Sequence, residues 1–342
     1  MDEMFENWES PPSLPDMDAE LKQLRRSLNR HNRKIILTSL ILALVLMLSV
    51  TYVIAPALET LYWAPYTSDY VQQGNDLKWT LQAYTELFYP GKQITSVYAN
   101  DNGFASYDLT ITRMNTATGE TEYIDGSLTR GTLDLDYPFY EYDLKRGFFR
   151  GNNNHPEEMM THYRDIATER LNQLPSFVTV EALAFFPEDL TMEQLQQLIF
   201  QYNYDGADGV ALKWIGVRNT PKDAENTTFA MGFSTGPNGD LALLDEHYPE
   251  MGMYHTKADG SHMEEHFKSL LRFSADQLDK GKGIPIVTLT GNHYRDVLAY
   301  VEENGVMSYG CLVTGTSAGL LSLLEDGVAS TLILTDGWID VG

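Results

Sequence analysis

The stretch 308-SYGCLVTGTSAGLLSLLEDGVASTLILTD-336 carries the strongest fold signal in this chain of 342 residues. An apolar, strand-like segment (308–315) is followed by small turn residues, a leucine-rich segment (317–326) and a second strand-like segment (329–336). A strand, a helix and a strand in succession are the parts of a βαβ unit. The stretch therefore predicts a C-terminal region of α/β or α+β class with βαβ-type units.

The same alternation of strands and helices starts at Pro175, so we expect a C-terminal domain over residues 175–342. Thr191 and Gln194 fit a capping box at the start of one of its helices. The further elements expected here are strands at 176–186, which Pro187 ends, and at 209–218, and helices at 190–202, 261–281 (capped by Ser261) and 292–305.

Residues 56–174 lack the regular alternation of strands and helices seen after Pro175, and their sequence pattern predicts a mixed α+β segment. Leu77, Leu81, Tyr84 and Phe88 recur at helical spacing within 75–89. Alternating strand formers then favour a β-meander, and the next helix is expected from Pro156 to about Gln173. The elements expected after the first helix are strands at 104–115 and 120–137, a polar loop at 150–160 and a helix at 156–173.

Inside the opening stretch, Gly315-Thr316-Ser317-Ala318-Gly319 has the G-x-S-x-G spacing of a nucleophile elbow and resembles the elbow of patatin-like lipases. The pair Asp336-Gly337 resembles the Asp-Gly of that family's dyad, but it follows Ser317 by only 19 residues and no glycine-rich oxyanion loop precedes the serine. We therefore favour helix capping by Thr316 or Ser317, and we assign no catalytic residue.

The segment 262-HMEEH-266 matches the H-x-x-E-H zinc signature. At about 100° per residue, however, the apolar stripe of this helix is rotated away from both histidines, so we expect His262 and His266 on a boundary or solvent face. No third ligand is identifiable, and we predict no metal and no cofactor. Asn226-Thr227-Thr228 is a glycosylation sequon with no supporting context.

Composition excludes several classes of function. The formal net charge is −24, and residues 57–342 carry 41 acids against 18 bases, so nucleic-acid binding by the bulk of the chain is not expected. Cys311 is the only cysteine, which rules out an intrachain disulfide and thiolate metal clusters. Its apolar neighbours indicate a buried thiol.

Residues 35–55 (IILTSLILALVLMLSVTYVIA) contain no charged side chain. A helix of 21 residues rises about 30 Å, the thickness of a bilayer's hydrocarbon core. A cleaved signal peptide is the alternative, but 34 residues precede the run and Pro56 follows it directly. We predict a single transmembrane helix that is retained as an anchor.

The charges beside this run predict its orientation. No Lys or Arg follows the run until Lys78, whereas six bases precede it, so the positive-inside rule places residues 1–34 in the cytoplasm and the C-terminal domain outside the cell membrane. The bases also suit contact with anionic membrane lipid. They are Lys22 and the membrane-flanking set Arg25, Arg26, Arg30, Arg33 and Lys34.

The cytoplasmic tail, residues 1–34, is the part that can meet cytoplasmic partners. Phe5 and Trp8 lie in an acidic, proline-containing stretch that has no core of its own. After a possible cap at Asp16 or Asp18, an apolar stripe at spacings of four, three and four predicts an amphipathic helix. This stripe, Met17, Leu21, Leu24 and Leu28, would lie on the membrane, continue the helix of the span, or seat in a partner's groove.

Four stretches resemble the bacterial sigma-factor regulator family, single-span anti-sigma factors found mainly in Firmicutes. They are 24-LRRSLNRHNRKIILTSLILALVLML-48, the pair ALAFFPEDLTMEQLQQLIFQY (182–202) and VALKWIGVRN (210–219), and YGCLVTGTSAGLLSLLEDGVASTLILTDGWIDV (309–341). In that family too, the position of Ser317 is a structural turn.

The resemblance implies a function in signal transduction and transcription regulation. The tail would sequester an extracytoplasmic-function sigma factor, and the outer region would act as an extracellular sensor domain for an envelope condition. The sigma factor would be released when the tail no longer binds it, for example after cleavage by a regulatory protease. The alternative is a membrane-anchored extracellular ligand-binding protein or hydrolase whose tail is only an anchor.

Overall fold

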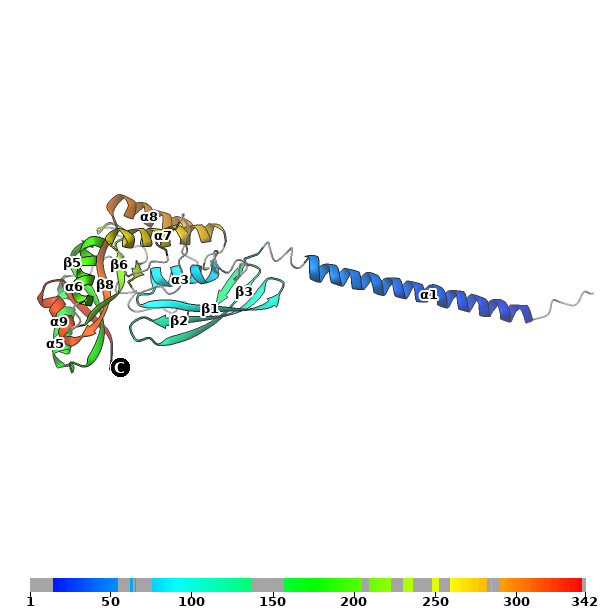
Figure 1. Cartoon of the computed structure of the whole chain (residues 1–342), viewed down its shortest axis with the longest axis horizontal. Coiled ribbons are helices and arrows are strands. Elements are labelled where there is room, and N and C mark those ends of the chain that lie inside the picture. The colour runs from blue at the N-terminus through cyan, green and yellow to red at the C-terminus, as the bar shows by residue number, and fades with distance from the viewer. Residues whose placement is uncertain are drawn as a thin grey trace, which may run out of the picture. The chain divides into compact units, whose positions relative to one another are not determined.

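The computed structural model forms two compact units, Met1–Leu61 and Tyr62–Gly342, which are described separately below (Figure 1). The structure describes residues 15–54, 62–63, 65, 76–136, 139, 157–204, 209–222, 230–235, 248–251, 259–281, 284 and 290–339, without the side chains of 15–19, 76, 203, 204 and 339.

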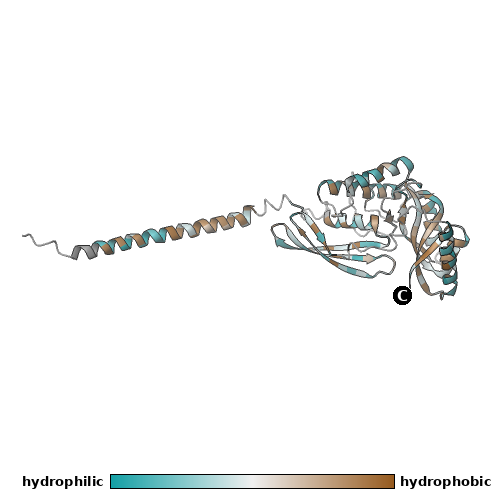
Figure 2. Ribbon diagram, turned by 180° about the vertical axis from the view of Figure 1, so that it is seen from behind, coloured by the Kyte–Doolittle hydropathy of each residue, from teal (hydrophilic) through white to brown (hydrophobic). Residues whose placement is uncertain are grey.

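The described part of the first unit is one long helix. Helix α1 covers Pro15–Ser49 and passes into a π-helical turn at Val50–Ile54. It holds a candidate membrane span, and none of the span's most apolar window is buried by the protein. Figure 2 shows the helix changing from mixed hydropathy near its start to predominantly hydrophobic near its end. The predicted single apolar helix is confirmed.

The second unit begins with a helix and an antiparallel meander. Helix α3 (Asp76–Phe88) precedes strands β1 (Lys92–Gly103), β2 (Ser106–Asn115), β3 (Thr121–Thr129) and β4 (Thr132–Leu135). These strands pair in the order β1-β2-β3-β4. The predicted meander is confirmed, but strand β1 was not predicted, because its second half (Asn100-Asp101-Asn102-Gly103) carries turn formers in place of strand formers.

A second sheet contains five strands in the order β7-β6-β8-β5-β9, and all its neighbouring strands are antiparallel. The predicted alternation of strands and helices is confirmed. The strands of this sheet and the helices between and before them are, in chain order, α5 (Glu157–Gln173), β5 (Val178–Thr191), α6 (Met192–Tyr204), β6 (Val210–Val217), β7 (Met231–Ser234), α7 (Gly260–Asp279), α8 (Gly291–Asn304), β8 (Met307–Thr316), α9 (Ser317–Glu325) and β9 (Thr331–Ile339).

The βαβ units of this sheet are of the split kind. Strands β5 and β6, joined through α6, are parallel but both pair with β8, which lies between them. Strands β8 and β9, joined through α9, likewise enclose β5. The chain order β5-α6-β6 and β8-α9-β9 therefore gives the β-α-β-β-α-β arrangement, with β7, α7 and α8 inserted between its halves.

Burial and pairing explain the sequence patterns of the two central strands. Eight of the ten residues of β8 are buried, which is why 308–315 is an almost continuous run of apolar and small residues. Pro187 does not end β5 as predicted; the strand continues to Thr191 with a register shift between Phe185 and Leu190. A bulge accommodates the missing N–H of proline.

Helix α3 is the most deeply buried helix of the second unit. From Leu77 to Phe88 every side chain is buried except that of Lys78, which is half-buried. The helix contacts β1, β7 and α7, and the indole Nε1 of Trp214 on β6 donates to the carbonyl oxygen of Glu86 at 2.7 Å. Helix α3 therefore joins the meander to the elements of the five-stranded sheet.

Candidate partner-binding helix

The leucine stripe of the tail is present and exposed. Leu21, Leu24 and Leu28 lie on α1 at spacings of three and four residues, so their side chains share one face of the helix. They are 56%, 60% and 51% exposed. Exposing three leucines on one helix face to water is unfavourable. This pattern is typical of a helix that binds in an apolar groove.

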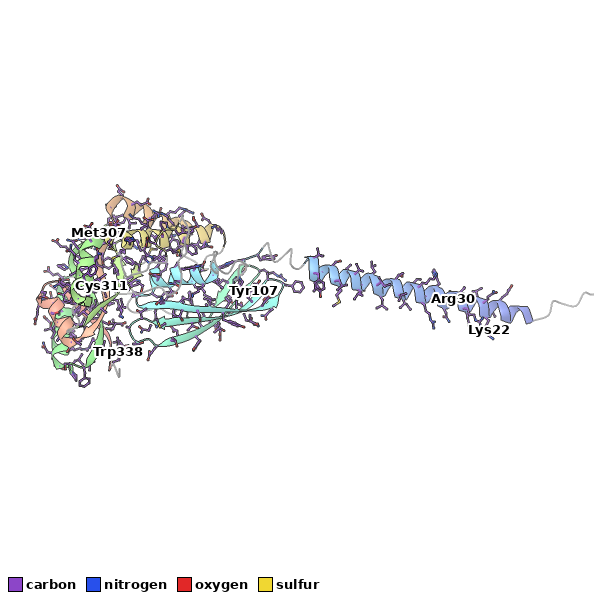
Figure 3. The ribbon with its side chains drawn as sticks, viewed as in Figure 1. Lys22, Arg30, Tyr107, Met307, Cys311 and Trp338 are labelled. Carbon is purple, nitrogen blue, oxygen red and sulfur yellow. The ribbon has the colours of Figure 1, made fainter. Side chains whose placement is uncertain are left out.

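The basic residues lie on the opposite face. At about 100° per residue, Lys22, Arg26, Arg30 and Arg33 project away from the leucines, and Arg25 lies at the border. Figure 3 labels Lys22 and Arg30 on this helix. The described tail thus has one apolar face and one cationic face.

The described part of the tail and the predicted span form one helix. Helix α1 runs through the junction at Lys34 without a break. Within the apolar part, the hydroxyls of Thr38 and Thr51 donate to the carbonyl oxygens of Lys34 and Met47, four residues earlier, at 2.8 and 2.9 Å. These hydrogen bonds satisfy polar groups that bilayer hydrocarbon would leave without partners. Of the three arrangements considered for the stripe, the structure shows continuation of the span's helix.

The start of the helix differs from the prediction. Among the described residues α1 covers Pro15 onward, so Asp16 and Asp18 lie within the helix and neither precedes it as a cap. Met17 belongs to the helix, but its side chain lies outside the described residues, as do Phe5 and Trp8.

The G-x-S-x-G segment forms a helix cap. Thr316 is the N-cap of α9, and its hydroxyl accepts a hydrogen bond from the backbone N–H of Gly319 at 3.2 Å. Ser317 is the first residue of the helix and is 7% exposed, whereas a nucleophile elbow holds its serine at an exposed turn. Asp336 pairs with Glu181 on β5, and Glu181 pairs with Thr314 on β8, so a whole strand separates Asp336 from the serine's strand.

The histidines of the HMEEH segment have different environments, and the prediction for His266 was wrong. His262 is 42% exposed, and its Nδ1 lies 2.7 Å from Asp259, the observed N-cap of α7 in place of Ser261. His266 is fully buried, because α7 packs against α3, α6 and α8 and so buries more of its surface than one apolar stripe. Among the described residues, no group of three or more His, Cys, Asp or Glu could hold a metal ion.

His266 forms a buried polar cluster with helix α3. Its Nε2 lies 2.9 Å from Oε1 of Glu86, and its Nδ1 lies 2.7 Å from the carbonyl oxygen of Glu250. Glu86 also accepts from the backbone N–H of Ser234 on β7 at 3.1 Å. Because both ring nitrogens face acceptor oxygens, the geometry favours a ring that carries both protons.

Electrostatics agree with this protonation state. Burial lowers the pKa of His266, but the Glu86 carboxylate and the carbonyl of Glu250 outweigh it and raise the pKa above the usual histidine value. Glu86 was missed in the sequence, where it is a single acid between two expected apolar positions of a helix. No local pattern indicates its partner, because the two residues are 180 positions apart.

The fold and the exposed helix together define the class of protein: a chain with one helix long and apolar enough to cross a membrane, consistent with a single-pass membrane protein, and an α+β region built on antiparallel sheets. Residues 171–331, a little under half of the chain, match the family described as sigma factor regulator C-terminal. This match confirms the resemblance to the sigma-factor regulator family predicted from the sequence. It supports a sigma-factor regulatory role, for which the family implies a sigma factor as partner. No curated protein and no solved structure matches.

Proposed function

We propose that this protein is an anti-sigma factor that sequesters an extracytoplasmic-function sigma factor at the membrane through residues 1–34. The observation that supports the proposal most strongly is the exposed stripe of Leu21, Leu24 and Leu28 on a helix that continues directly into an apolar span. The stripe is the binding surface for the sigma factor, and Phe5, Trp8 and Met17 extend it.

The remaining parts of the chain take complementary roles in this proposal. The tail lies in the cytoplasm, residues 35–55 cross the membrane, and two outer regions, 56–174 and 175–342, respond to an envelope condition. Arg25, Arg26, Arg30, Arg33 and Lys34 hold the helix at the anionic lipid surface. The sigma factor is released when the tail's contact is lost, for which proteolysis is one route. The protein needs no catalytic residue, cofactor or metal for this function.

The stripe can be tested by charge substitution in the full chain. Burying one leucine stabilises a complex by about 1.5–3 kcal/mol, and about 1.4 kcal/mol corresponds to one decade of affinity. The double variant Leu21→Asp, Leu24→Asp should therefore weaken capture of the sigma factor that the wild-type chain retains by at least about a hundredfold. Capture is measured with full-length protein in nanodiscs, and the sigma factor's genes are measured for derepression in cells.

A matched control separates the stripe from charge. Gln23→Asp with Asn29→Asp adds the same two charges on the exposed helix, away from the leucine face, and should leave capture within a few-fold of wild type. Equal loss in both double variants would mean that charge, and no apolar contact, controls binding. Unchanged capture by Leu21→Asp, Leu24→Asp would remove the stripe as the binding surface and favour a tail that is only an anchor.

A further inference from the structure

The four-stranded meander has one covered face and one open face. Leu109 and Ile111 on β2 and Ile124 and Leu128 on β3 are buried in the core, and the residues that alternate with them are exposed or half-buried. Strands β2 and β3 pair without a register shift, so the residues on the open face are known directly from the pairing. Helix α3 packs against the sheet through β1.

Two tyrosines stand on this open face. Tyr98 on β1 pairs with Thr110 on β2, and Tyr123 on β3 pairs with Thr112, two residues along the same strand. The tyrosines therefore lie on the same side of the sheet, on either side of β2. They are 64% and 72% exposed. Tyrosine is enriched at protein interfaces, where its large ring gives contact area at low conformational cost.

The charges on the same face have one sign. Asp125 pairs with Thr110, Asp108 pairs with Ser127, and Ser127 pairs with Asp134, so one exposed aspartate stands on each of β2, β3 and β4. The cationic strand residues lie on the covered side: Arg113 is buried, and both it and Lys92 pair with Glu122. The described strands thus place no Lys or Arg side chain among the three aspartates.

The exposed tyrosines and aspartates together favour a positively charged binding partner. A Lys- or Arg-rich segment relieves the repulsion between the carboxylates, and its cations also interact with the faces of the tyrosine rings. A neutral glycan would stack on tyrosine but leave the carboxylates unpaired, and an anionic lipid surface or a nucleic acid would be repelled. Asp108 and Asp134 stand two strands apart, roughly 10 Å, so a short segment reaches both.

We propose that the open face of this sheet, formed by Tyr98, Tyr123, Asp108, Asp125 and Asp134, binds Lys- or Arg-rich peptide segments. This face is named the tyrosine–aspartate face. Its binding activity is independent of whether the tail holds a sigma factor, so this proposal and the proposed function fail separately.

The test uses the full chain in phosphatidylcholine nanodiscs, whose zwitterionic lipid carries no net charge, and binding to empty nanodiscs is subtracted. Fluorescence anisotropy follows the binding of labelled decalysine and, as a charge-reversed probe, decaglutamate. Decalysine should bind and decaglutamate should not. The variant Asp108→Asn, Asp125→Asn, Asp134→Asn should weaken decalysine binding about tenfold or more, and Tyr98→Ala with Tyr123→Ala should weaken it several-fold.

The matched control is Asp165→Asn, Glu169→Gln, Glu303→Gln, which removes three exposed acids from α5 and α8 and changes net charge equally. It should keep decalysine binding within about twofold of wild type. Equal weakening by both triple variants would show attraction to the acidic protein as a whole and would overturn the proposal. The proposal is also overturned if decalysine does not bind or if the tyrosine variant binds as wild type does.

Discussion

At the scale of single residues, the pair of His266 and Glu86 is the most consequential contact in the second unit. The two side chains are 0% and 3% exposed and join α7 to α3. Removing one member of a buried charged pair leaves the other without compensation in a medium of low polarity, which destabilises a protein strongly. The contact between α3 and α7 therefore depends on the protonation state of the His266 imidazole.

The pair predicts a specific dependence of stability on pH. The pKa of His266 is raised in the folded protein, whereas histidine in the unfolded chain titrates near about 6.5. The stabilisation is therefore complete below about pH 6.5 and is lost as pH rises through the folded-state pKa. Relative to His266→Gln, the unfolding free energy of the wild type should fall above about pH 6.5 by up to about 1.4 kcal/mol per pH unit.

The measurement is urea unfolding of the full chain in detergent, followed by tryptophan fluorescence between pH 5 and pH 9. His262→Gln is the matched control, because it removes a partly exposed histidine from the same helix without touching Glu86. It should retain the loss of stability above about pH 6.5 that depends on His266. A difference between the wild type and His266→Gln that stays flat, or grows with pH, would contradict the proposed protonation state.

At the scale of elements, strand β7 depends on a glycine. A Cβ atom at Gly232 would overlap the carbonyl oxygen of Ile215 and the ring of Trp214. The ring of Trp214 lies against this glycine, and its Nε1 donates to the carbonyl oxygen of Glu86. The missing side chain of Gly232 therefore lets the tryptophan of β6 reach helix α3.

Gly232→Ala should consequently destabilise the second unit by about 1–3 kcal/mol, the usual cost of overpacking a core, and disturb the contact between Trp214 and α3. Urea unfolding and the tryptophan emission maximum measure the two effects. Gly337→Ala on β9 is the control, because the nearest atom to its Cβ would be 3.7 Å away. Similar stability of both variants would show that β7 can shift at little cost.

At the scale of the whole molecule, the decisive property is orientation in the membrane. The basic residues before the span predict a cytoplasmic N-terminus. A reporter that is active only in the cytoplasm should therefore work when fused before Met1 and fail when fused after Gly342. A reporter active only outside the cell should give the opposite pattern. Cytoplasmic activity of the C-terminal fusion would remove the proposed anti-sigma function, since the tail would then lie outside.

The sequence by itself determined the features that depend on local patterns. The uncharged run at 35–55 predicted the apolar helix, and the spacing of Leu21, Leu24 and Leu28 predicted their common face. Helix and strand periodicity located most elements of the second unit, and the capping box of Thr191 and Gln194 is present as predicted, with hydrogen bonds of 2.8 and 3.2 Å. Each of these signals is complete within a few turns of chain.

Only the tertiary structure decided which distant segments meet. It placed β8 between β5 and β6, which made the βαβ units split. It also buried His266 beside Glu86, although the helix pattern predicted a boundary or solvent face for this histidine. It also carried β5 past Pro187 and paired a strand, β1, that has turn formers in its second half. Strand order and the burial of a helix's second face depend on partners far away in sequence, and local periodicity carries no information about those partners.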